Sequence, residues 1–200
     1  MSWSWRTKPR SIIKTVQWFP FFAALQGQNW EEKTKYISKF DRKPIHPVRR
    51  AYIYKAHNDE DSWLSSISYN DYLYGQKDKK ETESNGRNDK TTFEFFGFGY
   101  VDEKGNICVS EIGNKIVQGT FDNEDYLKQL LKLRLPNLIT KTRDKGKNIG
   151  IFPFKLILSV FCYFESLNRS ELALLFGCTR DCDENNTIEG ISTTEPSFGL

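Results

Sequence analysis

The chain has 200 residues, of which 38% are hydrophobic, 14% are aromatic and 28% are charged. This composition is typical of a folded globular protein and argues against a disordered one, and the length allows one ordinary domain or two small ones. The apolar stretch 11–25 is interrupted by Lys14 and Gln17 and is too short to span a bilayer, and no signal sequence follows Met1. We therefore expect a cytoplasmic protein without membrane contact.

The four cysteines do not form a metal-binding pattern. Cys178 and Cys182 have a marginal spacing, the chain has no CxxC pair, and it has only two histidines. Structural zinc sites need four ligands at short characteristic spacings. We expect reduced thiols and no structural metal.

The net charge of +3 hides four blocks of alternating sign. Residues 1–57 hold 12 Lys and Arg against 3 Asp and Glu (+9), residues 58–126 hold 7 against 15 (−8), residues 127–158 hold 8 against 1 (+7), and residues 159–200 hold 2 against 7 (−5). Such blocks suggest separate surfaces, and the basic ones would suit a polyanion such as nucleic acid. Charge runs also keep surfaces solvated, and both interpretations stay open.

The first ten residues resemble an extended basic arm. They combine Trp3 and Trp5 with the cations Arg6, Lys8 and Arg10. Such arms often lie on a phosphate backbone or in a minor groove of DNA, so we take the three cations as candidate DNA contacts. Alternatively, the two tryptophans tie the arm to the core.

Three segments of regular structure are expected before residue 60. A helix over 11–24, capped by Ser11, has apolar residues on one face and is kinked or ended by Pro20. A second helix is expected over 30–40. Residues 48–57 form either helix or strand, and Arg49 and Arg50 make that segment basic in both cases, which adds them to the candidate DNA contacts.

Residues 75–87 contain no strongly apolar side chain and are expected to form an exposed loop. If the hairpin that follows is a wing, residues 88–96 occupy the place of a recognition helix, whose first turn faces base edges. Arg87 can then bind guanine and Asn88 adenine, and both bonds are bidentate. Lys90 and Thr91 suit phosphate contacts. Asp89 does not suit a DNA surface, and helix capping by Asp89 or Asn88 is the alternative role.

The segment 96–119 is the most informative part of the chain. Residues 98–101 and 106–109 favour strands, and the turn between them contains Lys104, a candidate phosphate contact, and Gly105, which is free to take a positive φ. Ser110 then caps a short helix with Ile112, Ile116 and Val117 on one apolar face, ended by Gly119. A charged hairpin followed by a short helix is typical of a winged helix-turn-helix, although it also occurs in ordinary α+β domains.

Helices also dominate the last third of the sequence. Asp122 or Asn123 is expected to cap a helix over 124–135 with Leu127, Leu130 and Leu131 inward, and Pro153 is expected to start an apolar helix whose face is Leu156, Ile157, Val160, Phe161 and Phe164. Ser170 would cap a shorter helix over 171–176. These elements make half of a second helix-turn-helix, but residues 191–200 have no helical pattern. The prediction is an α+β, mostly helical protein with two winged-helix-like subdomains, 1–120 and 121–200, the second truncated.

The segment GFGYVDEKGNICVSEIGNKIV, followed by DNEDYLKQLLKLRLPN, resembles the N-terminal part of the AlwI family of type IIS restriction endonucleases and related nicking endonucleases. The likeness extends over residues 6–176 and is strongest over 97–136. The family also has an Arg-Asp pair before the GF strand, where this chain has Arg87 and Asn88, which leaves room for a changed base preference. The matching positions are Gly97, Phe98, Gly105, Ser110, Gly113, Leu127, Lys128, Gln129, Leu130 and Pro136.

The resemblance implies a DNA-recognition region to which a separate metal-dependent nuclease domain is normally joined. Mg²⁺ is therefore expected only for that missing domain, and no cofactor is expected in this chain. The runs Glu31-Glu32-Lys33 and Asp102-Glu103-Lys104 contain the residue types of such a nuclease site. Neither has a partnering Asp on a preceding strand, so we expect no catalytic site here.

The expected function is sequence-specific binding of double-stranded DNA by a monomer, as the recognition part of a type IIS restriction or nicking endonuclease. The partners are double-stranded DNA and a separate nuclease domain or subunit. Two alternatives remain. One is a free-standing winged-helix regulator or replication protein, whose dimer would read a palindrome. The other is a degenerate, inactive endonuclease fragment.

Overall fold

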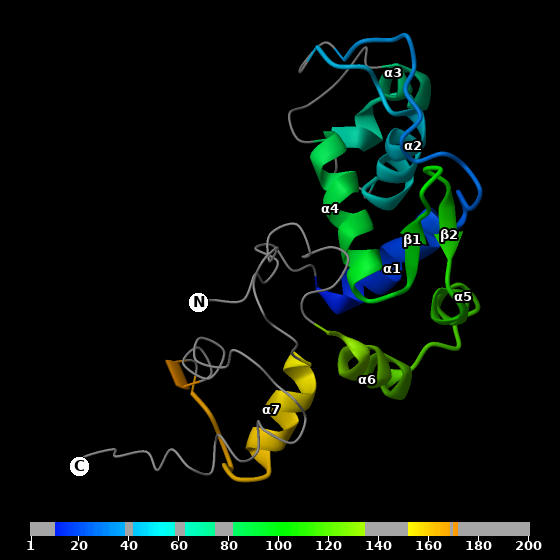
Figure 1. Ribbon diagram of the computed structural model, residues 1–200. Helices are drawn as coiled ribbons and strands as arrows, with labels where there is room; N and C mark the ends of the chain where they lie inside the picture. The colour runs from blue at the N-terminus through cyan, green and yellow to red at the C-terminus, as the bar shows by residue number, and fades with distance from the viewer. Residues whose placement is uncertain are drawn as a thin grey trace. The chain divides into compact units, whose positions relative to one another are not determined.

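A computed structural model describes residues 11–38, 42–58, 63–74, 82–134, 152–168 and 170–171. The described residues are mostly helical, with seven α-helices and one two-stranded antiparallel sheet (Figure 1). They belong to two compact units, one up to Asp122 and the other from Asn123 onward. Among them, no helix is both long and apolar enough to cross a membrane. The N-terminal arm with Arg6, Lys8 and Arg10 lies outside the described residues.

Helix α1 (Ile12–Ala23) is the centre of the first unit. The predicted helix over 11–24 is confirmed, and Pro20 lies inside it without ending it. Phe19 and Phe22, one turn apart, are fully buried, and Phe19 contacts the rings of Phe93 and Phe98 at centroid distances of 5.2 and 5.8 Å. Burial of these large aromatic side chains contributes to the hydrophobic stabilisation of the unit.

The helix predicted over 30–40 is wrong. In its place lies irregular chain with isolated bridges between Asn29 and Asn106 and between Ile37 and Pro44. Trp30 is fully buried, and its ring packs on Phe22 with centroids 5.4 Å apart. The backbone bonds of this stretch therefore go to distant segments and not to a helix turn.

Helix α2 (Pro47–Ala56) resolves the ambiguity over 48–57 in favour of helix. Pro47 stands at its start, where the missing N–H has no helical partner to lose. A 3₁₀ turn (Trp63–Ser66) and helix α3 (Tyr69–Leu73) follow, and the Ser68 hydroxyl accepts a hydrogen bond from Asp71 N at 3.1 Å. Helix α2 packs against α1, α3 and α4.

Helix α4 (Thr82–Phe95) begins earlier than expected, within the predicted loop 75–87. It packs against α2, α1 and β1. Its inward side includes Gly86, Asp89 and Thr92, which are buried, together with Phe93. Because three of these four are not large and apolar, the sequence shows no apolar stripe at helical spacing, although tertiary contacts bury that face.

The predicted hairpin and the helix after it are confirmed. Strand β1 (Gly99–Val101) pairs antiparallel with β2 (Ile107–Val109), with Tyr100 opposite Cys108. Gly105 has a φ of 89° in the turn. Helix α5 (Glu111–Val117) starts at Ser110, whose hydroxyl accepts a hydrogen bond from Gly113 N at 3.0 Å. Of the expected apolar face, Ile116 is buried but Val117 is 50% exposed.

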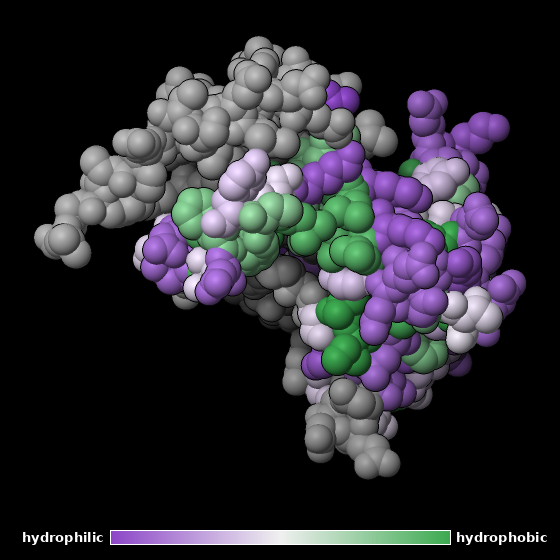
Figure 2. Space-filling view, turned by 90° about the horizontal axis from the view of Figure 1, so that it is seen from below, coloured by the Kyte–Doolittle hydropathy of each residue, from purple (hydrophilic) through white to green (hydrophobic). Residues whose placement is uncertain are grey.

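The second unit contains α6 (Asn123–Lys132) and α7 (Pro153–Phe161), which contact each other. On α7, Leu156 and Val160 are buried, whereas Phe161 is 47% exposed, so the expected apolar face is only partly inward. Leu127 of α6, also expected inward, is 46% exposed. Figure 2 shows hydrophobic residues among hydrophilic ones on the surface.

Of the short helix expected over 171–176, only its start is described, and Asn168 and not Ser170 is the residue that caps it. Asn168 Oδ1 accepts hydrogen bonds from Ser170 N at 2.8 Å and Glu171 N at 3.0 Å, and Glu171 Oε2 accepts one from Asn168 N at 2.7 Å. This reciprocal pair is a capping box. Residues 172–200, which contain the rest of the expected second helix-turn-helix, lie outside the described residues.

Candidate nucleic-acid interface

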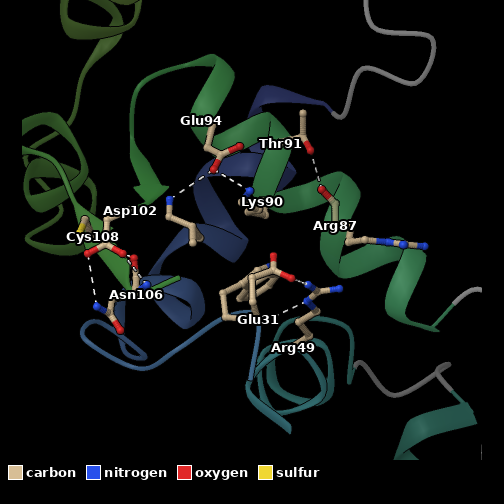
Figure 3. Close-up of polar contacts among 11 residues, drawn as sticks. Glu31, Arg49, Arg87, Lys90, Thr91, Glu94, Asp102, Asn106 and Cys108 are labelled. Atoms are coloured by element: carbon tan, nitrogen blue, oxygen red, sulfur yellow. Dashed lines mark hydrogen bonds and ion pairs between the residues drawn. The ribbon is translucent and has the colours of Figure 1, made fainter. Parts of the chain in front are cut away.

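The outer side of α4 carries three of the predicted DNA contacts. Thr91 lies four residues after Arg87 and three after Asn88, so it neighbours both on the helix surface. Arg87 is exposed and the other two are half-buried. In Figure 3 the Arg87 side chain extends away from the helix, and the Thr91 hydroxyl donates a hydrogen bond to the Arg87 carbonyl at 2.7 Å. These residues lie beyond the first turn, because the helix starts at Thr82.

The Lys90 side chain is linked through Glu94 to the start of the hairpin. Its ammonium lies 2.8 Å from Glu94 Oε1, and that same oxygen accepts a hydrogen bond from Val101 N at 3.3 Å (Figure 3). The Lys90 and Glu94 side chains are 22% and 17% exposed. Glu94 thus connects α4 to β1 and balances the charge of Lys90.

Asp89 does not cap a helix, contrary to one of the two roles considered for it. Its side chain is buried in the middle of α4, where Oδ2 accepts a hydrogen bond from the Tyr52 hydroxyl at 3.2 Å and lies 2.7 Å from His57 Nε2. Asn88 also lies inside the helix, away from its first turn. The acid that seemed unsuitable for a DNA surface is therefore turned away from the outer face of α4.

The imidazole of His57 is held between two elements. Its ring lies against the Trp18 ring of α1, with centroids 4.2 Å apart and a tilt of 32°, while Nε2 contacts Asp89 of α4. His57 follows the last residue of α2. Sequence reasoning missed this cluster because its members are 32 or more residues apart, and no local pattern indicates such a pairing.

The hairpin turn holds Lys104 on a fixed backbone. Asp102 Oδ1 accepts hydrogen bonds from Asn106 N at 2.7 Å and Lys104 N at 2.9 Å. These bonds lower the pKa of the Asp102 carboxyl, and the bond from Asn106 has the largest effect. The Lys104 carbonyl accepts a hydrogen bond from Asn29 Nδ2 at 2.9 Å. Lys104 itself is exposed. Its ammonium therefore projects from a turn that is anchored on both sides.

Arg49 and Arg50, expected on the surface, are 5% and 1% exposed. Arg49 donates a hydrogen bond to the Trp30 carbonyl at 3.0 Å and pairs with Glu31 (Figure 3). Arg50 donates one to the Tyr72 carbonyl at 2.7 Å, and its guanidinium lies over the Tyr72 ring. Both arginines hold α2 to neighbouring segments, so we remove them from the proposed DNA contacts.

The two carboxylate runs do not assemble a metal site in the part of the chain that the structure describes, where no group of three potential ligands comes together. Glu31 is paired with Arg49, and Asp102 bonds to the backbone of its own turn. A hydrolytic Mg²⁺ site needs several converging oxygen ligands. These two runs are accounted for by structural roles.

Comparison with known proteins adds no relative: no model of a protein family matches the chain, and neither does any curated protein sequence.

Proposed function

We propose that this chain binds double-stranded DNA sequence-specifically, with α4 as the reading helix and the β1–β2 hairpin as a wing on the phosphate backbone. The observation that supports this proposal is the outer face of α4, where Arg87, Asn88 and Thr91 stand together. The hairpin begins four residues after the helix ends. The order α2, α3, α4 and hairpin agrees with a winged helix-turn-helix.

The chemistry of that face suits the major groove. The guanidinium of Arg87 can donate two hydrogen bonds to guanine, and the amide of Asn88 can bond adenine at two atoms. Each such pair discriminates by about 1–3 kcal/mol against the wrong base. Two acids of α4 do not oppose an anionic ligand at full strength, because Asp89 lies against His57 and Glu94 against Lys90.

In this proposal the chain acts as the recognition part of a type IIS restriction or nicking endonuclease, as the resemblance over residues 97–136 implies. It binds as a monomer and reads an asymmetric site. Cleavage and its Mg²⁺ belong to a separate nuclease domain or subunit. The remaining proposed contacts are with phosphates. They are made by Lys90, Thr91 and Lys104, and by Arg6, Lys8 and Arg10 of the N-terminal arm.

A free-standing winged-helix regulator is the second candidate, because an exposed helix followed by a hairpin serves that role equally well. Selection of bound sequences from a random duplex pool separates the two. An asymmetric motif bound by a monomer supports the endonuclease reading, and a palindrome bound by a dimer supports the regulator. Fluorescence anisotropy over a range of salt concentrations tests both, since phosphate contacts release counterions. Absence of duplex binding at low salt would refute both candidates.

A further inference from the structure

The described residues 34–38 pair with the described residues 42–45 in the region where a helix was expected. Thr34 N donates to the Ile45 carbonyl at 2.9 Å, Ile45 N to the Tyr36 carbonyl at 3.1 Å, and Ser38 N to the Lys43 carbonyl at 2.9 Å. The bonded residues 34, 36 and 38 alternate as in a strand. We call the described residues 33–38 and 42–45 the basic loop.

The cations of the basic loop are exposed. Lys33 and Lys35 are exposed together with Tyr36 and Ile37, and Ser38 is buried at 3% exposure. Arg42, on the returning side, is also exposed. The residues of the basic loop, 33–38 and 42–45, include four Lys and Arg and no Asp or Glu, a net charge of +4.

This loop is anchored to the fold at Tyr36 and at Ile45. The Tyr36 ring meets the Tyr74 ring edge-on with centroids 4.9 Å apart, and the Lys35 ammonium lies 5.8 Å from the centroid of Tyr36. Ile45 is fully buried. An anchored loop loses less conformational freedom on binding than a free one.

Arg42 has a φ of 54°, in the left-handed region that favours glycine. The chain thus keeps an arginine where the backbone would be more stable with a glycine. An unfavourable backbone conformation retained at a cation is the kind of outlier that supports a hypothesis of function.

We infer that the basic loop binds the sugar-phosphate backbone of duplex DNA, outside the base pairs read by α4. This inference rests on the DNA binding proposed above. Residues two apart in extended chain are about 6.7 Å apart. Phosphates follow one another along each DNA strand, so Lys33 and Lys35 can each meet a phosphate of the same backbone.

The test is a double variant, Lys35→Gln with Arg42→Gly. Glycine accepts the backbone conformation at position 42, so the charge is removed without disturbing the loop, and a thermal unfolding midpoint equal to or above that of the parent verifies this. Loss of two phosphate contacts lowers the slope of log affinity against log salt by about 1.8. Between about 50 and 200 mM salt, the parent should therefore lose about tenfold more affinity than the variant. The selected DNA motif should not change.

The matched control is Lys14→Gln with Lys55→Gln, which removes two exposed charges elsewhere in the same unit. The inference is supported if the control variant has the same slope of log affinity against log salt as the parent and the loop variant has a lower slope. Equal slopes in the parent and the loop variant overturn it but leave the proposed function intact. A loop variant that loses affinity for single-stranded DNA but not for duplex DNA also overturns it. No duplex binding by the parent overturns the inference and the proposed function together.

Discussion

The carboxylate of Asp89 lies 2.7 Å from Nε2 of His57, in the interior of the first unit. Asp89 comes from the middle of the proposed reading helix, two residues after Arg87, yet its side chain is 1% exposed. The pairing joins α4 to the end of α2 and turns an acid away from the face proposed for DNA. The orientation of Arg87 and Asn88 therefore depends on this inner contact.

Replacement of Asp89 by alanine should destabilise the fold by on the order of 3 kcal/mol, because His57 and Tyr52 would lose a buried partner. Asp89→Asn should cost less, since its amide oxygen still accepts a hydrogen bond from Tyr52. Urea unfolding measures both, with Glu32→Ala at an exposed acid as the control. A loss below about 0.5 kcal/mol for Asp89→Ala, the size of an ordinary surface change, would contradict the prediction.

Two glycines should respond very differently to alanine. At Gly113 a Cβ would overlap the Phe98 carbonyl oxygen and come within 2.8 Å of Phe19 Cζ, so the α5 helix would be pushed off the core. We expect Gly113→Ala to cost about 3 kcal/mol or more, at the upper end of overpacking.

At Gly119 a Cβ meets nothing within 4 Å, and only its φ of 71° is unfavourable for alanine. Gly119→Ala should therefore cost about 1–2 kcal/mol. Thermal unfolding of the two variants tests the contrast. Similar losses at both positions would mean that the close approach of α5 to Phe98 and Phe19 is not tight.

The elements with strong local signals could be predicted from the sequence. Gly105 and the flanking β-formers indicate the hairpin, and Ser110 indicates the start of α5. Pro153 indicates the start of α7. In each case neighbouring residues give a strong local signal, because a turn, a cap or a proline acts within a few residues.

What could not be predicted depends on distant partners. The start of α4 could not be predicted from an apolar pattern, because its buried residues include Gly86 and Asp89. Gly86 lies against Ile53 of α2, and Asp89 against His57, which follows α2. Arg49 and Arg50 looked like surface cations, since arginine is rarely buried without partners that lie far away in sequence. At the candidate interface, exposure of Arg87 and Lys104 agreed with expectation.

This chain alone should not cut DNA in the presence of Mg²⁺ or Mn²⁺. In the two runs with residue types of a nuclease site, Glu31 pairs with Arg49 and Asp102 bonds to the backbone of its own turn. Incubation with supercoiled plasmid and gel analysis test this. Nicking that survives repurification and disappears in Glu103→Ala would show that the hairpin turn is catalytic.

Lys104 and Arg87 should have separable roles in binding. Lys104 projects from the hairpin turn and should touch phosphate only, so Lys104→Ala should weaken all DNA sequences alike. Loss of one phosphate contact lowers the slope of log affinity against log salt by about one. Anisotropy titrations on the selected site and on unrelated duplexes measure this. A loss confined to the selected site would assign Lys104 to base recognition.

Arg87→Ala should have the opposite pattern. Arg87 is exposed on the outer face of α4, and its side chain extends away from the helix (Figure 3). A bidentate bond to guanine is worth about 1–3 kcal/mol of discrimination, or roughly fivefold to more than a hundredfold in relative affinity. The variant should lose preference for that base pair while its binding to unrelated duplexes stays nearly unchanged.

Arg87→Lys is the conservative partner of this variant, because lysine keeps the charge but lacks the planar fork of donors. If charge alone matters, Arg87→Lys behaves like the parent. If the fork reads a base, it loses most of the preference, as Arg87→Ala does. Site selection with both variants decides between these results, and a motif identical to the parent's in Arg87→Ala would mean that another element reads the DNA.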